Sequence, residues 1–302
     1  MSRPVLVYGA GALGSLLGAL LSRRTAVRLV ARGEHARALR QQGGVRLSGL
    51  APGLYPVEVS ERAEAPDGAL VVVTVKAYDL EPALEELAPL LGPSHLVVVL
   101  QNGLGIRALA QQVLGREVIR GVTFMAASRE RPGEVAFNAA GKTYFPANEE
   151  ILQLWRAADM PAVQARDILT YVWRKLAINA VINPLSALLG VPNGELIALR
   201  ETTTELVEEL VQVAAREGQA LETAATVSKV LSSMRQTSRN TSSMLQDVRA
   251  GRPTEIDWIN GAVVRLADRH GLSTPRHRQL VLLVRFLAHH ASLAKVPVAS
   301  RT

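Results

Sequence analysis

The sequence predicts an α/β protein with two domains, a doubly wound sheet in residues 1–166 and an all-α domain in residues 167–302. Short apolar runs such as Ala69–Val75 are typical of strands that are buried on both faces of a parallel sheet. Helical patterns alternate with these runs, which is the order that builds a doubly wound fold. From about Asp167 onward only helical patterns follow, so we expect the domain boundary near residue 166.

The composition excludes several classes of protein. With 302 residues, of which 48% are hydrophobic and 20% charged, the chain is typical of a folded globular protein and is long enough for two domains. It has no cysteine, which excludes a disulfide framework and thiolate chemistry. The six histidines show no spacing typical of zinc ligands, so we expect no metal site.

The chain carries a net charge of +7 but only 4% aromatic residues. Its arginines are scattered, with no basic helix or aromatic stacking platform, so we do not expect nucleic-acid binding. A positive field favours small anions, such as a phosphorylated cofactor or a carboxylate substrate. The apolar N-terminus runs straight into a glycine loop, so we expect no signal peptide. No run of about 18 apolar residues occurs, so we expect no membrane span and a cytoplasmic location.

The first motif is a glycine loop between a strand and a helix. Pro4–Tyr8 is an apolar run, and an amphipathic helical pattern follows the loop. The loop reads Gly9, Ala10, Gly11, Ala12, Leu13 and Gly14. In this context Gly9 makes the tight turn, Gly11 lets the backbone approach a pyrophosphate, and Gly14 lets helix and strand pack closely. The helix N-terminus offers free N–H groups to phosphates, so the motif predicts a dinucleotide site.

The next strand predicts which dinucleotide binds. Ala26–Ala31 reads as a strand, and Arg32 follows it at the position where an NAD-binding unit has Asp or Glu. An acid would repel a ribose 2′-phosphate, whereas an arginine pairs with it. The expected cofactor is therefore NADPH or NADP+. The alternative is that Arg32 is an ordinary surface arginine.

The remaining strands complete the sheet and bring polar residues to one edge. Lys76 follows the strand Ala69–Val75. Gln101 and Asn102 follow a second strand, and ligands bind at the carboxyl edge that these strands share. The other expected strands are Val45–Leu47, Leu54–Val59, His95–Leu100 and Val118–Ala127, with an antiparallel hairpin of Val135–Phe137 and Thr143–Phe145 around Gly141.

The second half reads as helices, and the cleft between the two domains is the expected site. The expected helices are Asp167–Leu189, Thr202–Leu221, Thr223–Arg235, Ser242–Ala250, Glu255–His270 and Pro275–Ala294. From the residues alone, Ser242 reads as a helix cap and Glu255 as an acid in a first helical turn, or both as functional groups.

A polar row lies beside an apolar face in the first of these helices. The apolar positions recur at three-to-four spacing, at Leu176, Ala177, Ala180 and Val181. Lys175, Asn179 and Asn183 are four residues apart and therefore share one side of the helix. Pro184 is expected to stop or kink the helix. The row is either an exposed polar stripe or a set of donors facing a ligand, with the lysine placed for proton transfer.

Together with these features, several blocks of sequence resemble the ketopantoate reductase family, also called 2-dehydropantoate 2-reductase. The blocks are the glycine loop, Lys76, Gln101–Gly103, Trp173–Pro184, Pro192–Leu196, Ser242–Asp247 and Thr254–Gly261. The resemblance covers essentially the whole chain and is weaker from Phe137 to Asp167. It implies a Rossmann-type N-terminal domain and NADPH-dependent reduction of 2-dehydropantoate (ketopantoate) to (R)-pantoate, a step of pantothenate and coenzyme A biosynthesis.

The resemblance also implies roles for individual residues. Lys175 matches the family's proton donor, and Glu255 matches an acid close to the cofactor and to that lysine. The implied substrate-binding residues are Asn102, Lys175, Asn179, Asn183, Asn193, Asn240, Ser242 and Ser243. Beyond the glycine loop and Arg32, the implied cofactor-binding residues are Lys76, Asn102, Ala127 and Glu255.

Three alternatives stay open. A sister enzyme of the same fold could reduce another branched 2-keto acid. A different β-hydroxyacid dehydrogenase could use the same lysine helix, although the blocks around Ser242 and Glu255 argue against it. A binding protein could sense NADP(H) without turnover. The expected partner is a small-molecule 2-keto acid, and the oligomeric state is open, with a homodimer as one alternative.

Overall fold

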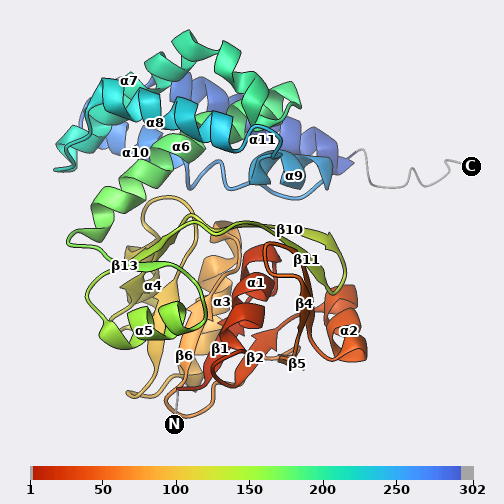
Figure 1. Ribbon diagram of the computed structural model, residues 1–302. Coiled ribbons are helices and arrows are strands. Elements are labelled where there is room, and N and C mark those ends of the chain that lie inside the picture. The colour runs from red at the N-terminus through yellow and green to blue at the C-terminus, as the bar shows by residue number, and fades with distance from the viewer. Residues whose placement is uncertain (1–2, 294–302) are drawn as a thin grey trace, which may run out of the picture. The chain divides into compact units, whose positions relative to one another are not determined.

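The computed structural model describes residues 3–293 (Figure 1). Contacts within the chain divide it into two units. The first comprises the chain up to Gln101 together with Gly105–Tyr171, and the second comprises Asn102–Leu104 and the chain from Val172 onward. The first unit contains parallel strands with helices and the second is helical, so the predicted fold class is confirmed.

The core of the first unit is a parallel sheet with the strand order β5-β2-β1-β6-β7-β8. Its strands are β1 (Val5–Tyr8), β2 (Val27–Val30), β5 (Glu58–Ser60), β6 (Leu70–Val73), β7 (Leu96–Val99) and β8 (Ile119–Arg120). All residues of β1 and β6 are buried, so these apolar runs are strands covered on both faces, as predicted. The direction of strand order reverses between β1 and β6, which is where doubly wound sheets bind ligands.

Helix α1 (Ala12–Leu21) lies between two sheets. One side packs against β1 and β2, and the other packs against a sheet of order β10-β11-β3-β4. The strands of that second sheet are β3 (Val45–Gly49), β4 (Gly53–Tyr55), β10 (Ala126–Arg131) and β11 (Glu134–Ala139). Because both sides are covered, every residue of α1 from Gly14 to Leu21 is buried.

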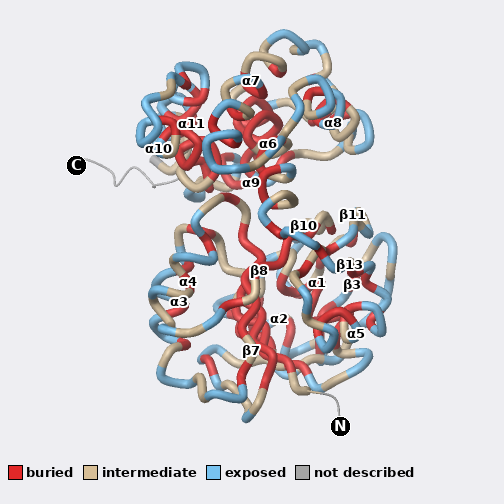
Figure 2. The backbone as a smooth tube through the Cα atoms, turned by 90° about the vertical axis from the view of Figure 1, so that its left-hand side faces the viewer, coloured by how far each residue is buried: buried red, intermediate tan, exposed pale blue. Residues whose placement is uncertain are grey.

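Helices α3 (Leu80–Leu87) and α4 (Ile106–Leu114) cover the opposite face of the parallel sheet, to the left of β7 in Figure 2. They complete the layered arrangement that the alternation of strands and helices predicts. The first unit also contains α2 (Gly33–Gln42), the 3-10 turns η1 (Ala77–Asp79) and η2 (Ala88–Leu90), and α5 (Glu149–Ala157).

The hairpin predicted around Gly141 is wrong. Residues 134–139 form β11, which makes an antiparallel hairpin with β10 and pairs in parallel with β3. The turn of that hairpin contains Gly133 at φ +83°. Residues 143–145 form β12 (Thr143–Phe145) of a third sheet, between β9 (Val122–Thr123) and β13 (Ala162–Gln164). The end of β10 is charged and exposed, so a search for apolar runs missed it as a strand.

The predicted strand Val118–Ala127 is three short strands, β8, β9 and β10, in three different sheets. The chain turns out of the parallel sheet at Gly121, where a Cβ would lie 2.6 Å from the side chains of two neighbours. Buried Arg120 fixes this turn by donating to the carbonyl oxygens of Val99, Gln101 and Gly121 at 3.1, 2.6 and 2.8 Å. Burial lowers the pKa of Arg120 to about 10.

The predicted strand Leu54–Val59 is also divided. Its two ends lie in β4 and β5, which belong to different sheets. Pro56 lies between them and has no N–H to donate to a strand ladder. A paired central strand therefore cannot continue through this position.

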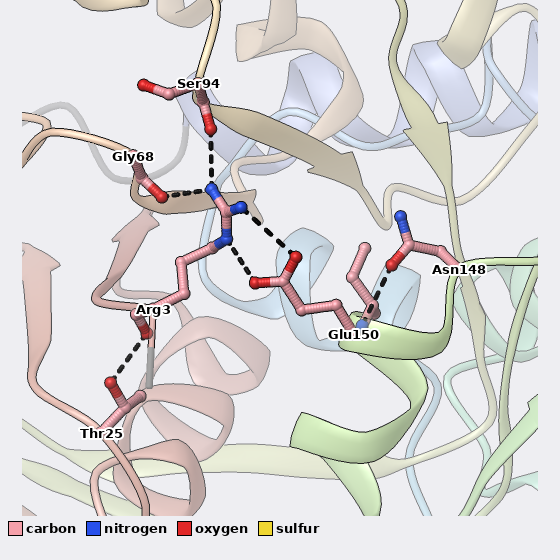
Figure 3. A network of polar contacts seen from close by, with 7 residues as sticks. Arg3, Thr25, Gly68, Ser94, Asn148 and Glu150 are labelled. Carbon is pink, nitrogen blue, oxygen red and sulfur yellow. Dashed lines mark hydrogen bonds and ion pairs between the residues drawn. The ribbon is translucent and has the colours of Figure 1, made fainter. Parts of the chain in front are cut away.

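Arg3 holds the amino edge of the parallel sheet together (Figure 3). Its guanidinium donates to the carbonyl oxygens of Gly68 and Ser94, which precede β6 and β7, and pairs with Glu150 on α5. Thr25, just before β2, donates through Oγ1 to the Arg3 carbonyl oxygen at 2.7 Å. One side chain thus fixes the starts of several strands, so this edge has a structural role.

Helix α6 (Ile168–Leu189), whose first turn belongs to the first unit, is the central helix of the second. The other helices are η3 (Asn193–Ala198), α7 (Arg200–Arg216), α8 (Thr223–Gln236), α9 (Ser243–Arg249), α10 (Asn260–Arg269) and α11 (Pro275–Leu293). Leu176, Ala177 and Ala180 of α6 pack with α7, α9, α10 and α11, which confirms the predicted apolar face. Val181 and Leu185 pack with α7 and α8, so burial extends around the helix (Figure 2).

Pro184 does not end α6, which continues past it, so the first alternative predicted for this proline is wrong. Because proline lacks an N–H, the Ala180 carbonyl oxygen loses its helical donor. Asn260 Nδ2 replaces that donor at 2.8 Å and also donates to His277 Nδ1 at 3.0 Å. His277 Nε2 donates to the Leu206 carbonyl oxygen at 2.9 Å. Side chains of α10 and α11, both 0% exposed, thus connect α6 to α7.

The helix predicted to begin at Glu255 begins instead at Asn260. Residues 255–259 form turns, and the carbonyl oxygen of Trp258 accepts from the Leu104 N–H at 3.2 Å. Gly103 has φ +95°, and a Cβ on it would overlap the Trp258 backbone. The turns are therefore packed against a segment more than a hundred residues away in the chain, which a local pattern does not reveal.

The buried His277 predicts a pH dependence of stability. Burial lowers the pKa of His277 from 6.5 to about 4, so between these values the unfolded chain binds a proton that the folded chain does not. The free energy of unfolding should therefore fall as the pH falls through this window, by up to ~3 kcal/mol, and the loss should level off below it. Denaturant unfolding at several pH values measures this.

His277→Gln is the test variant, because a carboxamide can accept from Asn260 and donate to Leu206 without titrating. Its free energy of unfolding should depend less on pH than that of the unmodified protein. The exposed His289→Gln is the control and should keep the original dependence. Parallel pH profiles for the unmodified protein and His277→Gln would contradict the assignment.

Candidate functional site

The glycine loop joins β1 to α1 in the geometry that a dinucleotide needs. Gly9 has φ +111°, and a Cβ on it would lie 2.7 Å from Val75 N. A Cβ on Gly14 would overlap the Gly9 carbonyl oxygen and Thr74 Oγ1, so helix and strand approach through glycine alone. A Cβ on Gly11 would meet nothing within 4 Å, so this position borders open space. No side chain caps α1, whose first N–H groups are directed to the same loop.

A pocket of about 350 Å³ adjoins the loop at the carboxyl ends of β1 and β2. Gly9, Ala10 and Arg32 line it, as the sequence predicts for a dinucleotide site. It is also lined by Tyr8, His35, Asp79, Glu86 and Arg129. A second hollow of similar volume lies at the opposite, amino edge, where no predicted site residue occurs.

Arg32 makes an ion pair that the sequence did not reveal. Its terminal nitrogen lies 2.9 Å from Glu86 Oε2 on α3 and donates to the Tyr8 hydroxyl at 3.3 Å. The Tyr8 hydroxyl in turn donates to Glu86. Burial and this bond to Glu86 raise the pKa of Tyr8 to about 12, and donation from Tyr8 lowers the pKa of Glu86. The three side chains form one hydrogen-bonded group, here called the Arg32–Glu86–Tyr8 cluster.

His35 supports the glycine loop from the other side of the pocket. The Gly133 N–H donates to His35 Nδ1 at 2.9 Å, so Nε2 carries the proton and donates to Ser15 Oγ at 3.0 Å. Ser15 Oγ lies 3.3 Å from the Ala10 carbonyl oxygen. Burial, with a contribution from Arg129, lowers the pKa of His35 to about 4. A neutral imidazole thus connects the loop to the β10–β11 turn.

The two other cofactor residues predicted in this unit lie at element ends and edges. Lys76 is the residue before η1, at the carboxyl end of β6, and is half-buried. Ala127 lies in β10 opposite Phe137 of β11 and is also half-buried. The position of Lys76 agrees with the carboxyl edge expected for it, and the contact of both residues with a cofactor stays a prediction.

The polar row of the second unit lies on α6 as predicted. Lys175 and Asn179 are half-buried, and Asn183 is 6% exposed. The simple reading of this row as an exposed stripe is therefore wrong for Asn183 and incomplete for its two neighbours. The alternative interpretation, in which this row faces a ligand, stays a prediction.

Asn102 and Glu255 are 153 positions apart in the chain but in contact. Asn102 Nδ2 donates to Glu255 Oε2 at 3.2 Å within the second unit. Glu255 is 5% exposed, and Asn102 is half-buried. The resemblance implied both residues as cofactor ligands, and the structure brings the two together.

Asn193 and Asn240 form a second group. The Asn193 N–H donates to the Asn240 carbonyl oxygen at 3.0 Å, and Asn193 Nδ2 donates to Thr237 Oγ1 at 2.9 Å. Asn193 Oδ1 is buried and has no hydrogen-bond partner, which is unusual for a buried acceptor. An acceptor of this kind suits a substrate hydroxyl.

Ser242 and Ser243 differ in their surroundings. Ser242 Oγ accepts from the Leu245 N–H at 3.1 Å and caps α9, so the structural interpretation of this residue is confirmed. Ser243 is the exposed first residue of the helix. Its contact with a substrate stays a prediction.

Sequence reasoning missed Tyr8, His35, Asp79, Glu86 and Arg129 in the pocket. Each lies outside the motifs and looks like an ordinary core or surface residue in its own element. Within residues 3–293 the structure has no group of three His, Asp or Glu that could hold a metal ion, and no helix long and apolar enough to cross a membrane.

Comparison with known proteins decides the family. The model described as "Ketopantoate reductase PanE/ApbA" matches residues 5–150, and its C-terminal counterpart matches residues 167–288. The chain belongs to the ketopantoate reductase family. The resemblance found in the sequence is therefore confirmed, and the protein is an oxidoreductase of this family.

Relatives of this ketopantoate reductase family member match most of its length. A 2-dehydropantoate 2-reductase of Archaeoglobus fulgidus is 36% identical over 293 residues, which is 93% of this chain and 96% of the relative. A ketopantoate reductase structure from Ralstonia eutropha matches with a TM-score of 0.88 and 29% identity, over 96% of this chain and 99% of that one. A D-mandelate dehydrogenase solved with NADH and anilino(oxo)acetate matches with the same TM-score and the same coverage, at 25% identity.

The glycine loop provides a matched pair of variants. Gly11→Ala should leave stability unchanged, since its Cβ meets nothing, but should weaken dinucleotide binding about tenfold or more by blocking close approach of the phosphates. Gly14→Ala should lower the melting temperature, because its Cβ overlaps the Gly9 carbonyl oxygen. Thermal unfolding and fluorescence titration with NADPH measure the two effects. Undiminished binding by Gly11→Ala would place the phosphates elsewhere.

Proposed function

We propose that this protein reduces the C2 ketone of 2-dehydropantoate to (R)-pantoate with NADPH. The observation that carries the proposal is the match of both halves of the chain to one reductase family. The geometry supports it independently, since the chain has a glycine loop that fits a dinucleotide and a polar contact between half-buried Asn102 and buried Glu255.

The first unit supplies the residues for cofactor binding. The backbone at Gly11 and the N-terminus of α1 would take the pyrophosphate, and Arg32 would meet the ribose 2′-phosphate. When bound, NADPH supplies the hydride that reduces the ketone. Arg129 lines the same pocket and adds a second positive charge there.

The second unit supplies the residues for substrate binding and proton transfer. As the ketone is reduced, its oxygen gains negative charge, and the Lys175 ammonium hydrogen-bonds this oxygen and donates its proton. Asn179, one helical turn later, holds a substrate oxygen beside it. The polar row is half-buried to buried, so water competes little for these donors.

Glu255 orients the nicotinamide end of the site together with Asn102. The carboxylate accepts from Asn102 Nδ2, which leaves the Asn102 carboxamide oxygen available to a ribose hydroxyl. Asn102 follows the end of β7 by three residues in the chain.

A second candidate is a reductase of another 2-keto acid. The D-mandelate dehydrogenase relative, solved with NADH, has the same fold at 25% identity. NADPH and NADH oxidation should be assayed with 2-dehydropantoate and with oxo(phenyl)acetate, the keto acid that corresponds to mandelate. The proposal requires that 2-dehydropantoate with NADPH gives the highest kcat/KM. A higher value with oxo(phenyl)acetate selects the second candidate, and no oxidation with either rejects both substrates.

Cofactor choice should depend on Arg32. Arg32→Ala should weaken NADPH binding by about 1.5–3 kcal/mol, the value of a charge-assisted hydrogen bond, and leave NADH binding nearly unchanged. Fluorescence titration of both nucleotides measures this. Arg40→Ala, which removes an exposed arginine from α2 outside the pocket lining, is the control for net charge. An unchanged NADPH affinity in Arg32→Ala would refute the role of Arg32.

Lys175 should be the proton donor. Lys175→Ala should reduce kcat by about 10²-fold or more, while NADPH affinity should scarcely change because it is set mainly by the glycine loop and Arg32. Lys175→Arg should not restore kcat, because a guanidinium keeps its proton near neutral pH. Arg174→Ala, at the exposed neighbouring position, is the control and should keep full activity. Full kcat in Lys175→Ala would show that the lysine is structural.

A further inference from the structure

The pocket that adjoins the glycine loop contains as much negative as positive charge. Arg32 and Arg129 line it, and so do Asp79 and Glu86. Arg32, which follows the second strand, would by itself favour a phosphate. Here Glu86, on helix α3, contacts the same guanidinium. The charge that a 2′-phosphate meets is therefore not set by Arg32 alone.

Glu86 is held in place from three directions. Its Oε2 lies 2.9 Å from the Arg32 guanidinium and accepts from the Tyr8 hydroxyl, and its Oε1 lies 3.4 Å from the Ala63 N–H. Tyr8 is 4% exposed at the carboxyl end of β1, so it fixes the carboxylate to a rigid strand. A side chain bound in this way stays beside Arg32 rather than turning into water.

The contact occupies groups that a phosphate would use. A guanidinium binds a phosphate most strongly through two parallel N–H groups. In the Arg32–Glu86–Tyr8 cluster, one terminal nitrogen of Arg32 is shared by Glu86 and Tyr8. A 2′-phosphate must either displace the Glu86 carboxylate or bind next to its negative charge. A ribose 2′-hydroxyl is uncharged, so it is not repelled by the Glu86 carboxylate and does not need to displace it.

We propose that Glu86 is a specificity-determining residue, which competes with the 2′-phosphate for Arg32 and so lowers the preference of this protein for NADPH over NADH. The proposal rests on the function proposed above only in assigning the 2′-phosphate to Arg32. Asp79 lacks this role, because the ion pair with Arg32 is made by Glu86. Glu86 remains negatively charged at neutral pH, since donation from Tyr8 lowers its pKa.

Glu86→Gln tests the proposal by binding alone. The variant keeps the size of the side chain and an oxygen that accepts from Tyr8, but it loses the charge. Equilibrium titration with NADPH and with NADH, without any keto acid, gives the ratio of the two affinities. The ratio should shift towards NADPH by about two- to fivefold, as for an exposed ion pair. Tyr8→Phe removes a contact that holds Glu86 and should shift it the same way by a smaller factor.

Glu85→Gln is the matched control, since it removes the same charge from the preceding position of α3 and lies outside the pocket lining. It should leave the ratio unchanged. In an Arg32→Ala background, Glu86→Gln should change the ratio no more than Glu85→Gln does, because the guanidinium that Glu86 contacts is gone. Thermal unfolding of each variant confirms that it is folded.

The outcomes separate this proposal from the proposed function. An unchanged ratio in Glu86→Gln, with a reduced ratio in Arg32→Ala, overturns the role of Glu86 and leaves the role of Arg32 intact. An unchanged ratio in Arg32→Ala overturns both roles of the pocket residues. A failure to reduce 2-dehydropantoate rejects the proposed substrate but has no effect on the binding ratios.

Discussion

The packing of the helical unit is organised around the Ala180 carbonyl group, which needs a hydrogen-bond donor from outside its own helix. Pro184 lies inside the central helix α6 and deprives the Ala180 carbonyl oxygen of its donor. Asn260 supplies the missing donor from α10. The same carboxamide reaches His277 and through it Leu206, so four helices share one buried chain of hydrogen bonds. The polar row with Lys175 lies on this helix, and its position is therefore fixed by the packing of the entire unit.

This arrangement explains why a proline occurs in a helix that carries candidate catalytic groups. A proline interrupts one hydrogen bond without ending the helix when another group replaces the donor. The replacement donor must come from outside the helix. A directional hydrogen bond therefore joins α6 to a neighbouring helix in addition to the apolar contacts. Apolar packing alone would permit α6 to rotate or slide by small amounts, whereas a buried hydrogen bond sets one position.

The sequence predicts those parts of the fold that are determined locally. β1 and β6 are apolar on both faces, and that pattern has few interpretations. The prediction fails where tertiary contacts choose the sheet, as at Gly121, where one apolar run turns through three sheets. It fails again at Glu255, where contact with the distant segment Asn102–Leu104 accompanies a helix start at Asn260.

The candidate site residues also fall into two groups, those that a local motif marks and those that only tertiary contacts reveal. The glycine loop, Arg32 and the Lys175 row are local motifs, so the sequence alone could name them as candidates. Glu86 lies on an amphipathic helix that resembles any surface helix, 54 positions from its partner Arg32, so no local signal marks it. The contact between Asn102 and Glu255 was equally hidden, although the family resemblance had identified both residues separately.

The burial of α1 between two sheets has a consequence for the order of events during synthesis. The first sheet uses strands that begin near the N-terminus, but the cover on the other side of α1 comes mainly from β10 and β11, which end at Ala139. The Gly133 N–H, which fixes His35 behind the glycine loop, lies in the same late segment. A nascent chain therefore cannot complete its nucleotide pocket when the glycine loop leaves the ribosome. Until residues 126–139 have emerged, the part of α1 that β10 and β11 cover remains exposed in the nascent chain.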